Sequence, residues 1–227
     1  MKIVCSLLGS LSLLLVTQAS VASGGGSMSG MSSMSSPVTP QERAKQDYNS
    51  GVRYIAKAKD LEDDAAKAAT PEKKQKVLSK AQKQYGKAAD EFKEALGNDP
   101  SLYQAWSYLG FALRHQGNYD AALDAYAHAL QLNPNYGEAV EYRAEALLGL
   151  NRTEEAKAAY MTLFASSRPL ADELMTAMKH WVESRQEDPK GLSADELANF
   201  SQWVDERSNI ARQTASLATD TSGASWK

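Results

Sequence analysis

The chain of 227 residues has few of the residue types that build metal sites and catalytic centres. It has one cysteine, Cys5, and three histidines, and no two histidines stand at the spacing of a zinc site. The sequence contains no nucleophile elbow and no glycine-rich phosphate loop. We therefore predict no catalytic residue, no metal ligand and no cofactor, and we expect a protein that is not an enzyme.

The chain also has no large excess of charge of either sign and few long apolar runs. The formal net charge is −3 at pH 7, which leaves no basic footprint for a nucleic acid. Beyond the first residues, no run of about 18 apolar residues could span a membrane. Alanine is frequent and β-branched residues are few, a composition that favours helices. These features predict an all-α protein that has no nucleic-acid partner and no membrane span once its N-terminus is removed.

Residues 1–22 have the pattern of a secretory signal peptide. Lys2 supplies the positive charge, residues 3–16 form the apolar core, and residues 19–23 offer small side chains for cleavage. An uncleaved anchor helix is the alternative, whereas a lipoprotein is disfavoured because Cys5 precedes the apolar core. We expect a periplasmic or secreted protein whose mature form has no cysteine and needs no disulfide.

Residues 23–40 consist mainly of Ser, Gly, Met and Pro, which predicts a flexible linker. Met28, Met31 and Met34 recur at every third position, and thioether sulfurs are ligands that select Cu(I). Extracytoplasmic copper handling through this segment is therefore the alternative function. No histidine or cysteine lies nearby to strengthen it.

Residues 103–136 carry the clearest pattern in the chain. Small and apolar residues recur at helical spacing over two consecutive segments. The defining positions are Trp106, Leu109, Gly110, Ala122, Tyr126 and Pro134. Gly110 and Ala122 are small enough for two helices to touch, and Pro134 cannot continue a helix. The pattern resembles a tetratricopeptide repeat, a helix–turn–helix unit of about 34 residues.

Equivalent residues occur on both sides of this repeat. They are Ala144, Ala156 and Tyr160 towards the C-terminus and Ala88 towards the N-terminus. Such neighbours are needed, because a single repeat cannot bury its apolar face. The resemblance implies a right-handed solenoid of about three helical hairpins. The expected units are residues 41–100, 101–134 and 135–168.

The unit at residues 41–100 is longer than the others. Gly51 occupies the place of the central glycine, but a much longer stretch separates it from Ala88 than in the central repeat. Thr70 and Pro71, a helix N-cap followed by a first helical residue, lie midway between them. We predict two matched helical extensions that form an arm of roughly 18 Å.

The distribution of charged residues also favours a folded helical arm. Acidic residues at 60–64 would face the lysines at 73–80 when the hairpin folds back. Exposed pairs of this kind contribute about 0–1 kcal/mol each. The alternative is a disordered acidic-then-basic loop between shorter helices.

Two helical patterns without the repeat signature follow in residues 169–216. Solenoids need atypical ends that close their core, so we predict a C-terminal helical cap with Trp181 and Trp203 inside it. Residues 217–227 are polar and predict a disordered tail.

In the family that the pattern resembles, the first helices of the hairpins line a concave groove that binds a peptide or a partner's helix. The corresponding positions here are Tyr48, Asn49, Gln104, Ser107, Tyr108, Phe111, Arg114, His115, Glu138, Glu141, Tyr142 and Glu145. Two alternatives stay open, since the aromatic residues can also be packing residues and the glutamates can also be a solvated helix face.

The charge of this groove suggests its partner. Glu138, Glu141 and Glu145 share one helix face, which predicts a protein or peptide partner with basic residues. Family members that bind a C-terminal carboxylate use Lys, Asn and Arg, and that set is absent here. The matching positions are Tyr48, Val52, Tyr108, Glu138 and Tyr142. The predicted function is a non-enzymatic protein-binding adaptor or scaffold in the cell envelope.

Overall fold

The computed structural model describes residues 38–221, and every regular element in this part of the chain is an α-helix. The predicted signal peptide, the methionines of the predicted linker and residues 222–227 lie outside the described residues. The helices are α1 Pro40–Ala66, α2 Pro71–Asn98, α3 Tyr103–His115, α4 Tyr119–Leu132, α5 Gly137–Gly149, α6 Thr153–Ser166, α7 Arg168–Glu187 and α8 Ala194–Thr221.

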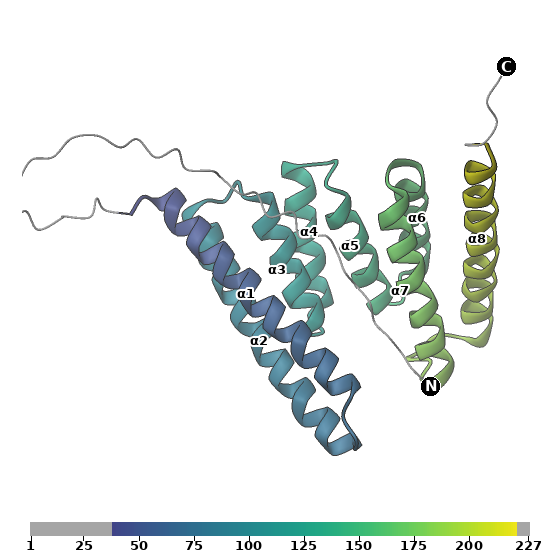
Figure 1. The fold of residues 1–227 in the computed structure, drawn as a ribbon, viewed down its shortest axis with the longest axis horizontal. Helices are drawn as coiled ribbons and strands as arrows, with labels where there is room; N and C mark the ends of the chain where they lie inside the picture. The colour runs from purple at the N-terminus through teal and green to yellow at the C-terminus, as the bar shows by residue number, and fades with distance from the viewer. Residues whose placement is uncertain (1–37, 222–227) are drawn as a thin grey trace, which may run out of the picture.

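Each helix packs against the next one in the chain, so hairpins succeed one another along the molecule (Figure 1). The first helices of the hairpins, α1, α3, α5 and α7, also contact one another in that order. Among the described helices, the second helices α2, α4 and α6 do not pack closely against each other. The predicted all-α helical-hairpin solenoid is confirmed, with the first helices on the more crowded side.

In the first two hairpins, a glycine of one helix lies directly beneath an aromatic ring of the other. A Cβ atom on Gly110 would lie 2.6 Å from Cε1 of Tyr126, and one on Gly51 would lie 2.6 Å from Cε1 of Phe92. Such distances are too short for any real Cβ contact, so both positions require glycine for the helices to approach this closely. In the third hairpin, Ala144 lies with Tyr160 in one fully buried cluster.

The first hairpin is the long one. Helices α1 and α2 have 27 and 28 residues, against 13 and 14 in α3 and α4. Thr39 and Glu42 form a capping box at the start of α1. Thr70 caps α2 and Pro71 is its first residue. The matched helical extensions predicted from the sequence are present, and the alternative of a disordered loop is wrong.

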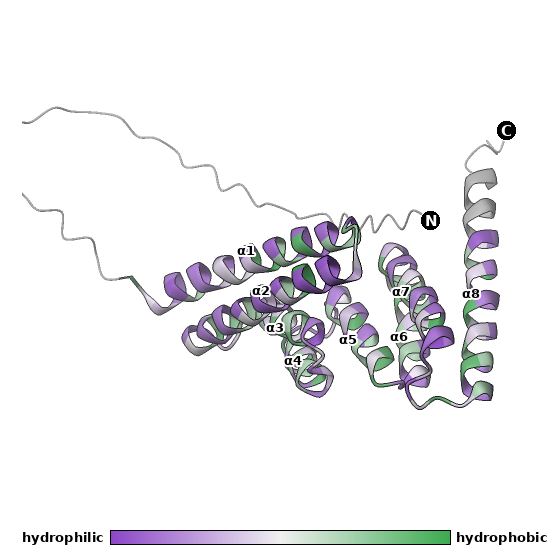
Figure 2. Ribbon diagram, turned by 90° about the horizontal axis from the view of Figure 1, so that it is seen from below, coloured by the Kyte–Doolittle hydropathy of each residue, from purple (hydrophilic) through white to green (hydrophobic). Residues whose placement is uncertain are grey.

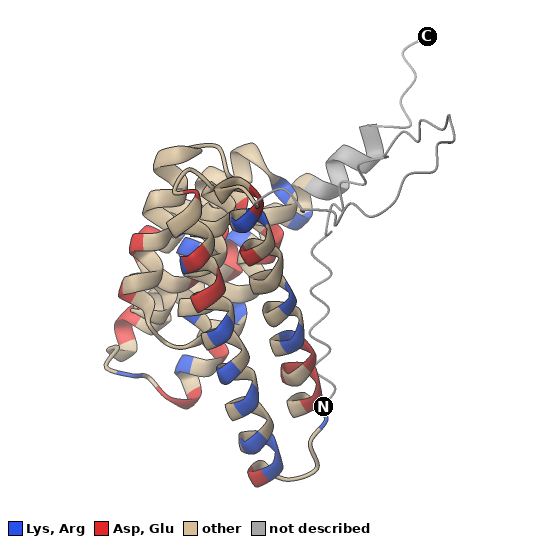
Figure 3. Cartoon of the chain, turned by 90° about the vertical axis from the view of Figure 1, so that its left-hand side faces the viewer, with Lys and Arg blue, Asp and Glu red and all other residues tan. Residues whose placement is uncertain are grey.

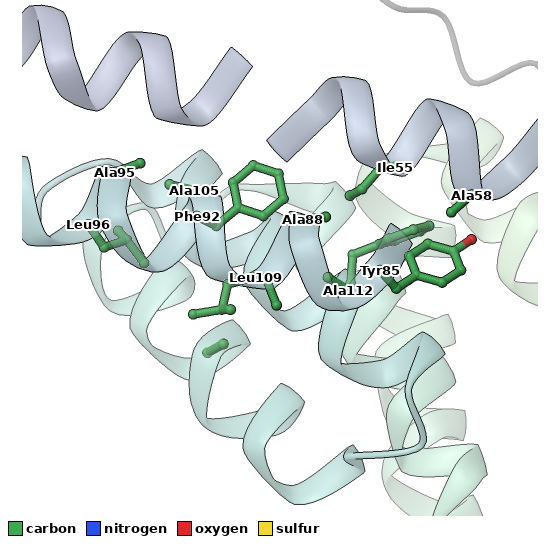
Figure 4. Packing of buried hydrophobic residues seen from close by; sticks show 13 residues of the cluster. Ile55, Ala58, Tyr85, Ala88, Phe92, Ala95, Leu96, Ala105, Leu109 and Ala112 are labelled. Atoms are coloured by element: carbon green, nitrogen blue, oxygen red, sulfur yellow. The ribbon is translucent and has the colours of Figure 1, made fainter. Parts of the chain in front are cut away.

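Small side chains form much of the interface inside the long hairpin. Ala58, Ala65, Ala81 and Ala88 are all buried between α1 and α2, and Figure 4 shows Ile55 and Ala58 of α1 facing Tyr85, Ala88 and Phe92 of α2. The ribbon of Figure 2 is more hydrophilic along α1 and α2 than along α3 and α4. The arm therefore has a narrow apolar seam between two largely polar surfaces.

The expected ion pairs across the arm do not form among the described residues. Asp64 pairs with Lys67 of its own segment at 4.0 Å, and Glu62 bonds to residues that are not lysines. Figure 3 shows acidic residues near the tip of the arm and basic residues along both of its helices. The lysine side chains extend into solvent instead, where a pair gains little.

Helices α7 and α8 close the other end. The ring of Trp181 lies edge-on to Phe200 at 5.0 Å, and that of Trp203 lies edge-on to Tyr160 at 5.5 Å. Both tryptophans pack against the core, as predicted. Helix α8 ends at Thr221, within residues 217–227, for which the sequence predicts a disordered tail.

Candidate functional site

The residues predicted to bind a partner lie on α1, α3 and α5, the first helices of three consecutive hairpins. Their positions follow from the helical period, which places residues three and four apart on one face. What differs among them is burial. Among the twelve, Ser107, Phe111 and Glu141 are buried, with 1%, 5% and 3% of their surfaces exposed. Buried side chains cannot contact a partner unless the helices move apart, so these three are corrected from partner-binding to internal residues.

Aromatic side chains fill the middle of this face. Tyr48 contacts Phe92 and Tyr108 with ring centroids 5.8 Å apart in each case, and Phe92 stacks on Tyr108 at 5.6 Å. Further along, Phe111 meets Tyr142 edge-on at 5.1 Å. The alternative that these aromatics are packing residues therefore describes their contacts, because each ring lies against another ring.

A pair of carboxyl groups and an arginine replace the predicted acidic face. Glu145 forms an ion pair with Arg114 of α3, one hairpin away. Glu141 lies one turn earlier on α5 and is buried, and Oε2 of its carboxyl group has no hydrogen-bond partner among the described residues. Of the three glutamates, Glu138 alone is exposed. The neighbouring helices therefore cover Glu141, whereas Glu145 stays partly exposed with its charge paired to Arg114.

The pKa values of Glu141 and Glu145 move in opposite directions. Burial, followed by the charge of Glu145, raises the pKa of Glu141 to about 10, so Glu141 carries a proton at pH 7. Burial also acts to raise the pKa of Glu145, but the charge of Arg114 and a hydrogen bond with Glu141 outweigh it, and the net shift is downward. A protonated Glu141 beside a charged Glu145 avoids two like charges side by side.

His115 joins α3 to the arm. Its Nδ1 lies 3.3 Å from Oε1 of Glu62, and its ring stacks on Tyr85 at 4.3 Å. The Tyr85 hydroxyl donates to the other oxygen of Glu62 at 2.9 Å. Burial lowers the pKa of His115, so the ring is neutral at pH 7. His115 is therefore a structural link between the long hairpin and the central repeat.

Two hollows open at opposite ends of the face. One, of about 350 Å³, lies at the start of α1 and α3 and includes the predicted residues Tyr48 and Gln104. The other, of about 420 Å³, lies at the ends of α3, α5 and α7 and includes the predicted residues Arg114, His115 and Glu145. Each hollow thus includes residues that were predicted for the groove.

Sequence analysis missed the contribution of α7 to the second hollow. Trp181, Arg185 and Lys190 line it, although residues 169–216 were expected to serve as a cap. A signal was present, because Arg185 continues the apolar stripe of Met178 and Val182 at spacings of four and three. Arginine is rarely buried unless other groups stabilise its charge. An arginine on the buried face of a helix therefore indicates that such groups lie around it.

The described residues hold no group of three or more His, Cys, Asp or Glu side chains that could bind a metal ion. The methionines of the copper hypothesis, Met28, Met31 and Met34, precede these residues in the chain. None of the described helices has the length and apolarity that a membrane span requires.

In a comparison with known protein families, residues 103–136 match the tetratricopeptide repeat family. They comprise α3, α4 and the turn that follows. Together with the packed hairpins on both sides, the match supports a tetratricopeptide repeat protein and, in general terms, a role as a protein-interaction adaptor or scaffold.

Proposed function

We propose that this chain is an exported, non-enzymatic scaffold of the cell envelope that binds a segment of a partner protein at the start of α1 and α3. The observation that carries the proposal is the hollow of about 350 Å³ beside Tyr48 and Gln104. Both residues occupy groove positions of the family that residues 103–136 match. A hollow of this size accommodates one or two side chains of a bound segment.

The lining of this hollow suggests the partner's chemistry. Tyr48 and Leu102 supply apolar surface, and Gln41 and Gln104 supply amide groups. Lys45 and Asp99 bring one charge of each sign. We therefore infer a partner segment with an apolar anchor and polar flanks. The preference for basic residues that was expected from three glutamates has little support here, because Glu138 alone of them is exposed.

Export is the second part of the proposal, and it rests on the composition of residues 1–22. Cell fractionation and N-terminal sequencing of the mature protein test it directly. We expect the chain outside the cytoplasm with a new N-terminus at Ser23, after cleavage behind Ala22, or at Ser20 or Gly24. A full-length chain that begins at Met1 in the cytoplasm would disprove this part.

Photo-cross-linking tests the binding surface. A photoreactive amino acid replaces Gln104 in the hollow or, as a matched control, the exposed Gln131 on the second helix α4. We expect the same cross-linked partner in repeated experiments from position 104 and none of it from position 131. Equal yields from both positions would show that the partner does not use this hollow.

A further inference from the structure

The hollow of about 420 Å³ has an unusual charge arrangement. It lies where the C-terminal ends of α3, α5 and α7 meet the turn that precedes α8. Arg114, Arg185 and Lys190 line it together with a single carboxylate, that of Glu145. Since Arg114 pairs with Glu145, two positive charges remain without a carboxylate partner among the described residues.

Arg185 is the centre of this arrangement. Its side chain is buried, with 6% of the residue exposed, although no described carboxylate pairs with it. Its Nε donates to Oδ1 of Asn151 at 3.1 Å, and its guanidinium carbon lies 5.1 Å from the ring centroid of Trp181. A buried cation without a counter-charge is costly. This cost would be relieved by an anion in the hollow.

The surroundings hold this cation in place. Asn151, in the left-handed region with a φ of 59°, accepts from Arg185 and donates through Nδ2 to the carbonyl oxygen of Lys190 at 3.0 Å. Trp181 donates through Nε1 to the carbonyl oxygen of Leu148 at 2.6 Å. One side chain therefore positions both the Arg185 guanidinium and the backbone of Lys190, as in a preformed site.

Helix ends alone do not explain Arg185. The C-terminal end of α5 favours a nearby cation, but other donors already occupy its last carbonyl groups. Leu148 accepts from Trp181 and from the backbone of Asn151, and Leu147 accepts from the backbone of Arg152. The guanidinium of Arg185 bonds instead to a side chain, and it lines the hollow.

We propose that this hollow binds an oxyanion, a carboxylate or phosphate group, through the guanidinium of Arg185 and the ammonium of Lys190. The planar guanidinium matches both groups in geometry. The oxyanion can belong to a free small molecule or to an acidic side chain of a bound polypeptide. This site and the hollow beside Tyr48 share no residue. A failed cross-link at Gln104 would therefore count against the proposed partner site and not against the oxyanion site.

Titration of the full mature chain with inorganic phosphate and with succinate, followed by NMR, tests the site. We expect saturable shifts of the Trp181 indole N–H and the Arg185 Nε–H signals. Arg185→Gln should weaken binding about tenfold or more, because charged hydrogen bonds are lost. Lys190→Gln should weaken it about threefold, because the exposed lysine contributes less.

Lys83→Gln is the matched control, since it removes the same charge from the exposed side of α2. It should leave the affinity unchanged. If Arg185→Gln fails to fold, the anion affinities of Lys190→Gln and Lys83→Gln are compared instead, and a lower affinity of Lys190→Gln supports the site. The proposal is overturned if neither anion causes saturable shifts at these signals, or if Lys83→Gln weakens binding as much as the site variants do.

A second arm of the titration identifies the source of the oxyanion. An acetylated, amidated pentapeptide with one central Glu is compared with its Gln counterpart. Binding of the Glu peptide alone points to an acidic side chain of a partner. Binding of succinate or phosphate without binding of either peptide points to a free small anion. In both cases the site itself stands.

Discussion

The first hairpin and the central hairpin bring their two helices together in the same way, with a glycine beneath an aromatic ring, but the ring is a different residue in each. In α3 and α4, Gly110 lies beneath Tyr126, and in α1 and α2, Gly51 lies beneath Phe92 at the same distance. The central hairpin has neighbours on both sides, whereas the first has one and extends well beyond it. The shared close contact is therefore one part of the long hairpin's interface, which also contains the buried alanines Ala58, Ala65, Ala81 and Ala88.

The two hairpins differ in the polarity of what surrounds these rings. Phe92 lies against the rings of Tyr48 and Tyr108, in a cluster of aromatic and aliphatic residues. Tyr126 lies beside Arg114 and Glu145, and the charges of both act on its hydroxyl. The central hairpin therefore depends on buried charges as well as on apolar packing, and substitutions should separate these two contributions.

The largest effect is expected from Arg114→Met in the central hairpin. It leaves Glu145 without its counter-charge in a mostly buried place, and breaking such a pair costs about 3 kcal/mol. Denaturant unfolding measures the loss. Arg143→Met is the control, because its contact with Glu155 is 4.0 Å long and exposed and should contribute less than about 1 kcal/mol. Equal losses in both variants would show that Glu145 relaxes into solvent without cost.

Gly110→Leu and Gly51→Leu test the contact that the hairpins share. Each adds a side chain where a ring already lies, and overpacking costs about 1–3 kcal/mol. We expect Gly110→Leu to reduce hydrogen-exchange protection in both neighbouring hairpins, because repeats stabilise one another. Gly51→Leu should reduce it mainly in α1, α2 and α3.

Gly86→Leu is the control for these two variants, since nothing lies within 4 Å of an added Cβ there. A melting temperature of Gly110→Leu that equals that of Gly86→Leu would contradict the close contact of α3 and α4.

The pH dependence of stability tests the buried acid of the central hairpin. The pKa of Glu141 is raised to about 10 in the folded chain, against 4.5 as its ordinary value. Its contribution is therefore fully present below pH 4.5 and is lost as the pH rises towards 10. The slope is at most about 1.4 kcal/mol per pH unit.

Glu141→Gln should flatten this decline between pH 6 and 9, measured by denaturant unfolding at several pH values. Glu138→Gln, on the exposed face of the same helix, should leave the decline unchanged. The same slope in wild type and Glu141→Gln would mean that Glu141 is ionised in the folded protein.

The smallest effect is expected from Gly86→Ala in the long hairpin. An added methyl group meets no other atom, and alanine favours a helix interior over glycine by about 0.8–1 kcal/mol. We expect higher hydrogen-exchange protection in α2 and a gain in unfolding free energy of about that size. Gly97→Ala, next to the end of the same helix, should gain less. A loss of stability at position 86 would show that the arm needs flexibility there.

The helical hairpins were predictable because their determinants are local. The spacing of the apolar residues within each helix and the Thr70-Pro71 helix start depend on the chain's own period and caps. The ion pairs of the arm were predicted wrongly, because charge proximity in sequence says little about where long, solvated side chains extend.

The sequence by itself determined which residues share a helix face, and hence the all-α solenoid and the order of its hairpins. Only the tertiary structure decided which parts of that face stay open. It buried Glu141 beside Glu145, paired Glu145 with Arg114, and brought Arg185 to the end of the same face. The reason is physical: helical periodicity sets the direction of a side chain within one helix, whereas its burial, charge state and partners depend on the helices that pack over it.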